Sequence, residues 1–340
     1  MKSFISKRNM FRGLLCGTAA LATACSEVAF SPDPGYDGAL EIPPGYQLES
    51  FGFNDQDTRA KVDVLFVIDN SGSMLEEQTK LAPALSSFIT NIARIDWQIG
   101  ITTTDTSNGP FGLKGSLVNL NGAGGKVLSA ATPNYQQVFA NTVIRNELIG
   151  CVDPNCPSSD ERALEAATMA IGKRNSDNAG FFRQGADLAL VILSDEDEQS
   201  TGTGTTPAQV VNAVTSAFGP NKTFTSFGII IKPGDTACFA SQSATSGQYG
   251  DYASALADLT KGVTGSICDS DYGPSLESIG TRVREQVKSI TLKNMPNPDT
   301  IQIRIRPFDP NLTWTIEAQT LIFAYPPRSG TRIDVLYLPM

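Results

Sequence analysis

The chain has 340 residues, of which 41% are hydrophobic, and it carries a formal net charge of −9 with no histidine. This length provides for one α/β domain of ordinary size and a small additional region. The acidic charge argues against nucleic-acid binding and against direct contact with anionic lipid. The absence of histidine excludes Ser-His-Asp and Cys-His catalysis and removes the commonest general base.

Residues 1–24 have the pattern of a secretory signal, in which a basic start precedes an apolar stretch too short to span a membrane. The stretch ends in Leu-Ala-Thr-Ala before Cys25 and resembles a bacterial lipobox, so we expect a bacterial lipoprotein with lipid on Cys25. The alternative is an ordinary signal peptide that is cut near Ala24. Ser26 favours the outer membrane of the cell envelope, on its periplasmic or its surface face. The lipid would be the chain's only membrane contact.

The rest of the chain divides into three parts. Residues 25–59 contain several Pro and Gly residues and predict an extended, mostly unpaired, flexible tether. Residues 60–291 alternate strands and helices, which predicts an α/β fold with a doubly wound, mostly parallel sheet. Residues 292–340 predict a small antiparallel extension of about three strands.

The predicted elements follow in chain order. In the α/β part, strands are expected at 62–68, 97–103, 186–193, 224–231 and 265–268, and helices at 81–92, 134–148, 160–171, 207–218, 252–259 and 276–290. The glycine-rich segment 107–132 predicts a hairpin with its turn at 122–125. In the C-terminal part, strands are expected at 301–306, 313–324 and 332–338.

The most informative motif follows the first buried strand. The apolar run at 62–68 ends in Asp69-Asn-Ser71-Gly-Ser73, and ligands of open α/β sheets bind at the carboxyl ends of the strands. One carboxylate and two hydroxyls suit a hard divalent cation, and Mg²⁺ in particular takes few protein ligands. The alternative for these residues alone is a turn, because Asp, Asn, Ser and Gly dominate turns.

The cysteines predict disulfides. With Cys25 lipidated, an even set of four remains in an exported chain, and we expect two disulfides, Cys151 with Cys156 and Cys238 with Cys268. The alternative is a four-cysteine zinc site, which would require the two clusters to meet.

Phe-Val-Ile-Asp69-Asn-Ser71-Gly-Ser73-Met resembles the metal-ion-dependent adhesion site of von Willebrand factor type A domains, over roughly residues 60–291. The resemblance implies a Rossmann-like fold and five loop residues around the metal: Asp-x-Ser-x-Ser, a Thr before a later helix, and an Asp after the fourth strand. Asp195, at the end of Leu-Val-Ile-Leu-Ser-Asp, matches the last position.

The hydroxyl before the helix has several candidates. Ser158 fits the family's threonine best, and Ser159 and Asp160 remain open; Asp160 would make the site more acidic. Ser158 also begins Ser158-x-x-Glu161, which is a capping box, so that helix cap and metal ligand compete for one hydroxyl. We expect residues 196–198, in the acidic run after Asp195, to be solvated.

The resemblance implies a divalent-cation-dependent, adhesion-type module rather than an enzyme. Its cofactor would be Mg²⁺, with Mn²⁺ or Ca²⁺ possible, and its partner would be a protein that contributes a carboxylate to the metal. The alternative is a structural envelope lipoprotein in which a metal only stabilises loops. An enzyme with metal-activated water has less support, because no phosphate-binding loop and no evident base are present.

Overall fold

The computed structural model describes residues 42–52, 61–93, 95–145, 156–198, 205–219, 222–287, 289–324, 327 and 330–340. The predicted signal segment, Cys25, most of the predicted tether and Cys151 lie outside these residues. The described part of the chain contains one six-stranded sheet and two three-stranded sheets.

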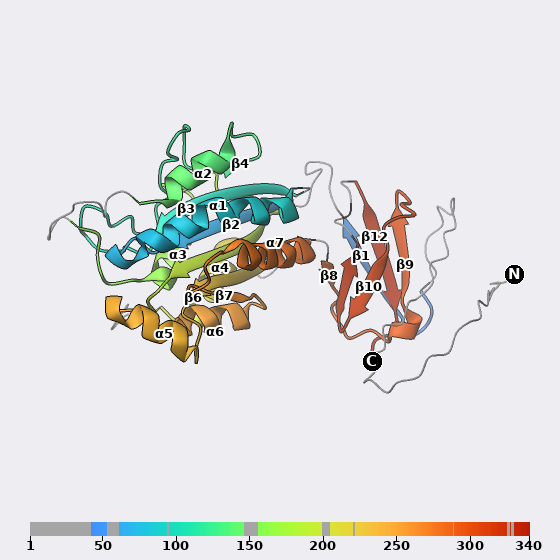
Figure 1. Ribbon diagram of the computed structural model, residues 1–340. Coiled ribbons are helices and arrows are strands. Elements are labelled where there is room, and N and C mark those ends of the chain that lie inside the picture. The colour runs from blue at the N-terminus through green and yellow to red at the C-terminus, as the bar shows by residue number, and fades with distance from the viewer. Residues whose placement is uncertain are drawn as a thin grey trace, which may run out of the picture. The chain divides into compact units, whose positions relative to one another are not determined.

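The six-stranded sheet is the centre of an α/β body (Figure 1). Its strand order is β4-β3-β2-β5-β6-β7, and neighbouring strands are parallel except β4, which is antiparallel to β3. The central strands are runs of apolar residues that are buried on both faces, as parallel strands between two helix layers must be. The predicted Rossmann-like α/β fold is confirmed. The strands are β2 (Lys61–Ile68), β3 (Asp96–Thr103), β4 (Leu128–Ser129), β5 (Asp187–Ser194), β6 (Phe224–Ile230) and β7 (Thr264–Ser266).

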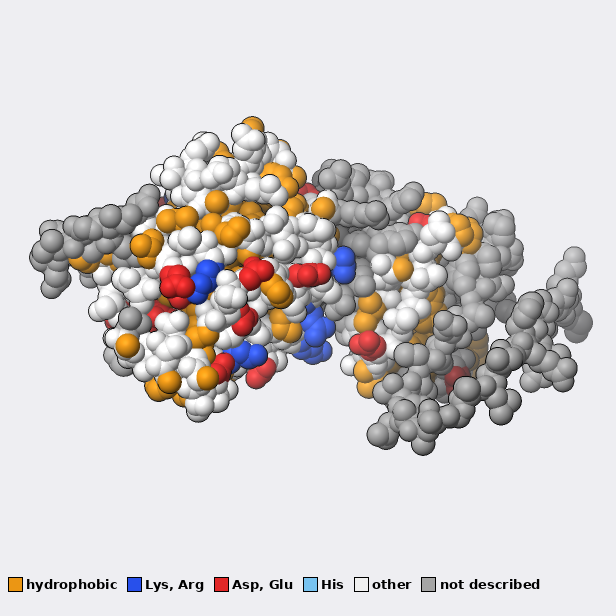
Figure 2. Space-filling model, viewed as in Figure 1, with side chains coloured by type: hydrophobic (Ala, Val, Ile, Leu, Met, Phe, Trp, Pro, Cys, Tyr) orange, Lys and Arg blue, Asp and Glu red, His pale blue; other side chains and the backbone are white. Residues whose placement is uncertain are grey.

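Helices cover both faces of this sheet. Alternate side chains of β2 point into two cores, one shared with α1, α2 and α7 and the other with α3, α4 and α6. Helices α1 and α7 lie side by side (Figure 1), and side chains of both charges are interspersed over the face they present (Figure 2). These helices are α1 (Leu75–Ile92), α2 (Tyr135–Val143), α3 (Ala163–Gly172), α4 (Pro207–Phe218), α6 (Asp251–Leu259) and α7 (Gly273–Val287).

Shorter helical segments complete the α/β body. They are η1 (Gly72–Met74), α5 (Thr236–Gln242) and η3 (Ser243–Thr245), and the sequence patterns did not indicate them. None of the described helices combines the length and the apolar composition needed to cross a membrane.

The glycine-rich segment 107–132 is not the predicted hairpin. Among its residues only β4 is a strand, and the rest is loop with a turn in which Leu120 N donates to Gly125 O at 2.9 Å. The prediction is wrong because β4 pairs with β3 instead of with another part of this segment. Leu117 enters the core beneath α3, whereas Val118 enters the core beneath α1.

The two small sheets are antiparallel, with strand orders β1-β12-β9 and β10-β11-β8, and one hydrophobic cluster takes side chains from both. Three stacked apolar positions of β12, at Ile333, Val335 and Tyr337, are fully buried in this cluster. The elements are β1 (Gln47–Gly52), β8 (Ser289–Thr291), η4 (Pro298–Thr300), β9 (Gln302–Arg306), β10 (Trp314–Glu317), β11 (Thr320–Phe323) and β12 (Arg332–Tyr337).

Two expectations for this region differ from the structure in detail, and the second of them is wrong. The first concerns the segment predicted as a mostly unpaired tether, in which β1 pairs with β12 and places Phe51 against the hydrophobic cluster; the tether as a whole stays a prediction, since most of it lies outside the described residues. The second is that 313–324 is one strand of a single sheet. It is a hairpin of β10 and β11, since Ala318 adopts a positive φ of 52° and the chain reverses there.

Candidate functional site

The carboxyl ends of the central strands bring the predicted motif residues together. Asp69 follows β2, and its backbone N donates to Leu193 O of the neighbouring strand β5 at 2.9 Å. Asp195 is the first residue after β5. Because β2 and β5 are parallel neighbours, both carboxylates leave the sheet at the same edge.

A chain of hydrogen bonds connects the motif to Asp195. Ser71 N donates to Asp69 Oδ1 at 2.8 Å, and the hydroxyls of Ser71 and Ser73 are 3.0 Å apart. The Ser73 hydroxyl donates to Asp195 Oδ1 at 3.1 Å. Ser194 closes the group from the other side, because its hydroxyl donates to Asp69 Oδ2 at 2.7 Å. Four of the five side chains predicted to surround a metal therefore lie together.

The carboxylates of this site are buried. Asp69 and Asp195 have 0% of their surface exposed. Burial raises the pKa of Asp69, and burial together with the nearby charge of Asp69 raises the pKa of Asp195 to about 7. Asp195 Oδ2 has no hydrogen-bond partner among the described residues. An ionised carboxylate in such a place is costly unless a cation compensates it.

Glu161 is a further member of the site that the sequence patterns did not identify. It is 1% exposed, and the Thr104 hydroxyl donates to its Oε2. Burial and the charge of Asp69 raise the pKa of Glu161 well above its ordinary value. The sequence signal that could have pointed to this part of the site is the polar residue Thr104, which directly follows the strand predicted at 97–103 and observed as β3.

Ser158 and Asp160 make other contacts. Ser158 N donates to Asp105 Oδ2 at 3.0 Å, and the Ser158 hydroxyl accepts from Asp160 N at 3.0 Å. Asp160 forms an ion pair with Arg162. The predicted capping box is wrong, because α3 begins at Ala163 and the Ser158 hydroxyl therefore lies too early to cap it. The predictions of Ser158 and Asp160 as metal ligands stay predictions.

The acidic run after Asp195 is not the solvated loop that its charge predicts. Glu196 is buried, with 7% of its surface exposed. Asp197 accepts a hydrogen bond from Tyr252 N in the first turn of α6 at 3.0 Å. Glu198 accepts from Leu164 N and Glu165 N, at 2.6 and 3.3 Å, in the first turn of α3. Asp197 and Glu198 are held in place because their carboxylates accept hydrogen bonds from backbone N–H groups at helix N-termini.

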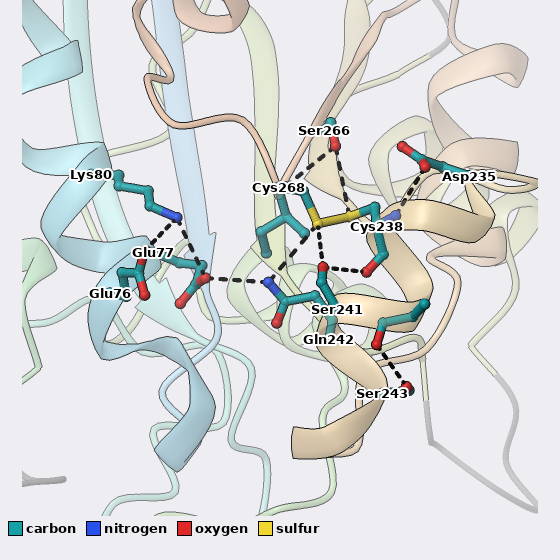
Figure 3. Close-up of a disulfide and its surroundings, with 12 residues drawn as sticks. Glu76, Glu77, Lys80, Asp235, Cys238, Ser241, Gln242, Ser243, Ser266 and Cys268 are labelled. Atoms are coloured by element: carbon teal, nitrogen blue, oxygen red, sulfur yellow. Dashed lines mark hydrogen bonds and ion pairs between the residues drawn. A yellow bond between two sulfur atoms is a disulfide. The ribbon is translucent and has the colours of Figure 1, made fainter.

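A disulfide lies beside the helix that follows the motif (Figure 3). Cys238 and Cys268 are bonded, which confirms that predicted pair. Gln242, on α5, has its amide nitrogen 4.0 Å from Cys268 Sγ and 3.5 Å from Glu77 Oε1 of α1 (Figure 3). Cys156 is also disulfide-bonded, whereas its predicted partner Cys151 lies outside the described residues.

The residues present fit a hard divalent cation. Among the described residues, no three His, Cys, Asp or Glu side chains form a preformed ligand group, so a cation would depend on serine hydroxyls for part of its ligands. Ser71 and Ser73 supply those oxygens between two buried carboxylates. Asp195 Oδ2, which has no hydrogen-bond partner among the described residues, is a further oxygen that could bind the cation. An all-oxygen donor set of this kind suits Mg²⁺, Mn²⁺ or Ca²⁺.

Comparison with known proteins gives structural similarities only, since no protein-family model and no curated protein matches the chain. The pilus adhesin SpaC from Lactobacillus rhamnosus GG matches with TM-score 0.36 and 10% identity over 86% of this chain. Manganese-loaded TRAP protein of Plasmodium vivax matches with TM-score 0.35 and 14% identity, over 69% of this chain and 75% of that one. The pilus adhesin RrgA from Streptococcus pneumoniae matches with TM-score 0.35 and 8% identity over 86% of this chain.

This chain spans 42% of the SpaC chain and 58% of the RrgA chain. Similarity at these TM-scores transfers no function to it.

Proposed function

We propose that this chain is an exported, lipid-anchored protein-binding module of the von Willebrand factor type A kind. It would hold a divalent cation at Asp69, Ser71, Ser73 and Asp195 and capture a carboxylate of a partner protein. The lipid would be on Cys25, which lies outside the described residues. The proposal is of a binding protein rather than an enzyme.

The observation that carries the proposal is the joining of two loops by hydroxyl and carboxylate oxygens. Ser71, Ser73 and Asp195 form a continuous hydrogen-bonded group, and Asp195 Oδ2 lacks a partner although it is buried. When bound there, a divalent cation would supply positive charge that offsets the carboxylates and would offer a coordination position to an incoming oxygen.

Access to the site comes from the motif loop itself. Gly72 is exposed and Ser73 is partly exposed, whereas Asp69 and Asp195 are enclosed. A partner would therefore approach over Gly72 and meet the hydroxyl side of the site first. The space beside Gly72 is open, because a Cβ added there would meet no atom within 4 Å.

The alternative function, a cation that only stabilises loops of an envelope protein, is favoured by one observation. Both motif carboxylates are fully buried, which suits an ion that is enclosed rather than shared. The two functions differ in what the cation enables, since a structural ion raises the melting temperature without creating a binding surface.

The test is an array of peptides that contain Asp or Glu, each beside the same peptide with Asn or Gln. Binding of the full chain is measured in Mg²⁺, in Mn²⁺, in Ca²⁺ and in a chelator. We expect capture of a subset of acidic peptides that is lost with the chelator, with the amide peptides and with Ser73→Ala. The control Ser86→Ala, at an exposed serine of α1, should bind normally. Capture that persists in the chelator would contradict the proposal, and so would a failure to capture any acidic peptide.

A further inference from the structure

The sheet β1-β12-β9 gathers charged side chains on one face. Alternate apolar positions of β12 enter the hydrophobic cluster, so Arg332 and Asp334, which lie between them, are on the opposite face. The neighbouring strands add the polar side chains that pair with these two residues in register, which are Ser50 of β1 and Arg304 and Arg306 of β9. This face therefore carries three arginines around one aspartate.

The buried carboxylate of Asp334 holds the three arginines in place. It is 1% exposed, and its Oδ2 accepts from Arg304 at 3.2 Å and from Arg306 at 2.5 Å. Its Oδ1 accepts from Arg332 Nε at 3.0 Å and from the Ser50 hydroxyl at 2.6 Å. Because all three guanidinium groups converge on one carboxylate, they are arranged side by side before any ligand arrives.

One carboxylate does not balance three arginines. Three positive charges and one negative charge leave a formal charge of +2 on this group, in a chain whose net charge is −9. Arg306 and Arg332 are direct register partners on neighbouring strands, where like charges destabilise a sheet. Arg306 Nε is buried and has no hydrogen-bond partner among the described residues. The excess of donors and of positive charge points to an anion that binds here.

The guanidinium groups are accessible to such an anion, whereas Asp334 is not. The side chains of Arg304, Arg306 and Arg332 are 24%, 36% and 59% exposed. An anion that approaches this face would therefore meet N–H groups before it meets carboxylate oxygens. Guanidinium groups bind phosphate through paired N–H donors, which makes arginine the preferred side chain for phosphate recognition.

We propose that Arg304, Arg306 and Arg332 form a binding site for a phosphate group, either free phosphate or a phosphate monoester. A phosphate monoester carries about −1.5 to −2 charges at pH 7, which matches the charge of +2, whereas a carboxylate would offset only half of it. The site shares no residue with the proposed cation site and stands or falls independently of it. The net charge of the chain does not argue against it, because the local charge of this face has the opposite sign.

The experiment follows the phosphorus NMR signal of sodium phosphate with the full chain, at constant ionic strength and in a chelator that keeps divalent cations out. A second arm measures co-sedimentation with phosphatidylcholine vesicles with and without phosphatidic acid, whose headgroup is a phosphate monoester. The variants are Arg306→Gln, Arg332→Gln and Arg332→Lys, and circular dichroism checks their folding. Arg282→Gln, at an exposed position of α7, removes the same charge elsewhere and is the matched control.

We expect the unmodified chain to broaden the phosphate signal. Binding only to vesicles with phosphatidic acid would also support the site and would identify a lipid headgroup as the source of the phosphate. Arg306→Gln and Arg332→Gln should each weaken binding by about tenfold or more. Arg332→Lys should have a smaller effect, because it keeps the charge and loses the paired donors.

Three outcomes would overturn the site. The first is an unmodified chain that binds neither phosphate nor the vesicles. The second is full binding by the folded variants Arg306→Gln and Arg332→Gln. The third is an equal loss in Arg282→Gln, which would show that only the overall charge of the chain matters. Acetate at the same concentration should not displace phosphate, and displacement would contradict the preference for a doubly charged anion.

Discussion

The Ser73 hydroxyl donates a hydrogen bond to Asp195 Oδ1 across 3.1 Å, which joins two loops that are 122 residues apart in the sequence. The contact is possible because β2 and β5 are adjacent parallel strands whose carboxyl ends coincide. Ser73 is partly exposed and Asp195 is fully buried. The contact therefore joins the solvent side of the site, at Ser73, to its core side, at Asp195.

Asp195→Asn should stabilise the metal-free chain and abolish its stabilisation by a cation. The substitution removes a buried charge that lies near Asp69, and the gain in the free energy of unfolding should be roughly 1–3 kcal/mol in a chelator. Urea denaturation with and without Ca²⁺ or Mg²⁺ measures both effects. The exposed Asp258→Asn serves as control. A variant that is less stable than the unmodified chain in a chelator would contradict the account of Asp195.

Glu198→Ala should destabilise the fold by about 1 kcal/mol, because two backbone N–H groups at the start of α3 lose their acceptor. Chemical denaturation measures the change. Glu277→Ala, at an exposed position of α7, should stay within about 0.5 kcal/mol of the unmodified chain. Equal effects of the two substitutions would show that Glu198 does not act as a cap.

Arg183→Met should cost about 3–5 kcal/mol, since it removes the guanidinium that pairs with the buried Asp63 carboxylate and leaves that carboxylate the backbone N–H of residue 183. Arg183 donates to Asp63 through Nε and through its backbone N, each at 2.7 Å. The double variant Asp63→Asn with Arg183→Met should be more stable than Arg183→Met alone. Thermal or urea unfolding of the three proteins decides this, and a double variant that is worse than the single one would refute the interpretation.

Replacing Cys238 and Cys268 together by Ala should lower the free energy of unfolding by about 2–4 kcal/mol, because the bond closes a loop of 30 residues. The loss should be measured by denaturation of both proteins without reductant.

Loss of the disulfide should also weaken the hydrogen bond from Gln242 to Glu77. Gln242→Ala should therefore lower the free energy of unfolding by less in the double-alanine variant than in the disulfide-bonded protein. An additive result would indicate that the disulfide does not position Gln242.

Asp187→Asn should stabilise the chain at pH 8 and leave its stability near pH 4 almost unchanged. Burial raises the pKa of Asp187 to about 6 in the folded state, above its unfolded value near 3.9. The folded state therefore binds more protons between these values, and stability falls as pH rises from about 4 through 6. Since the pKa of Asp197 is also raised to about 6, the variant should reduce this slope without removing it. An unchanged slope in urea denaturation would contradict the prediction.

Local pattern was sufficient for the central sheet and insufficient where a partner strand lies far away. The runs that became β2, β5 and β6 are continuous and apolar, so their burial follows from composition alone. β1 lies in a segment rich in Pro and Gly, and its pairing partner is β12, with Ser50 and Asp334 separated by 284 residues. A pattern within a few residues cannot report such a pairing.

The candidate site shows the same division. Asp69, Ser71, Ser73 and Asp195 could be predicted because each ends or follows a recognisable strand. Glu161 could not, since Ser158-x-x-Glu161 has the pattern of a helix cap and only the fold shows its hydrogen bond with Thr104, which follows β3. Glu198 was expected in solvent for a similar reason. Its hydrogen-bond donors are backbone N–H groups of α3, which lie 34 and 33 residues earlier in the sequence.

The central claim is that a divalent cation binds among Asp69, Ser71, Ser73 and Asp195. The most direct measurement is a crystal structure of the full chain grown with Mn²⁺, with the ion located by its anomalous scattering. We predict a peak about 2.0–2.6 Å from the hydroxyl oxygens of Ser71 and Ser73 that is absent from Asp69→Ala crystals. Crystals of the unmodified chain with no peak at these hydroxyls, at saturating Mn²⁺, would contradict the claim.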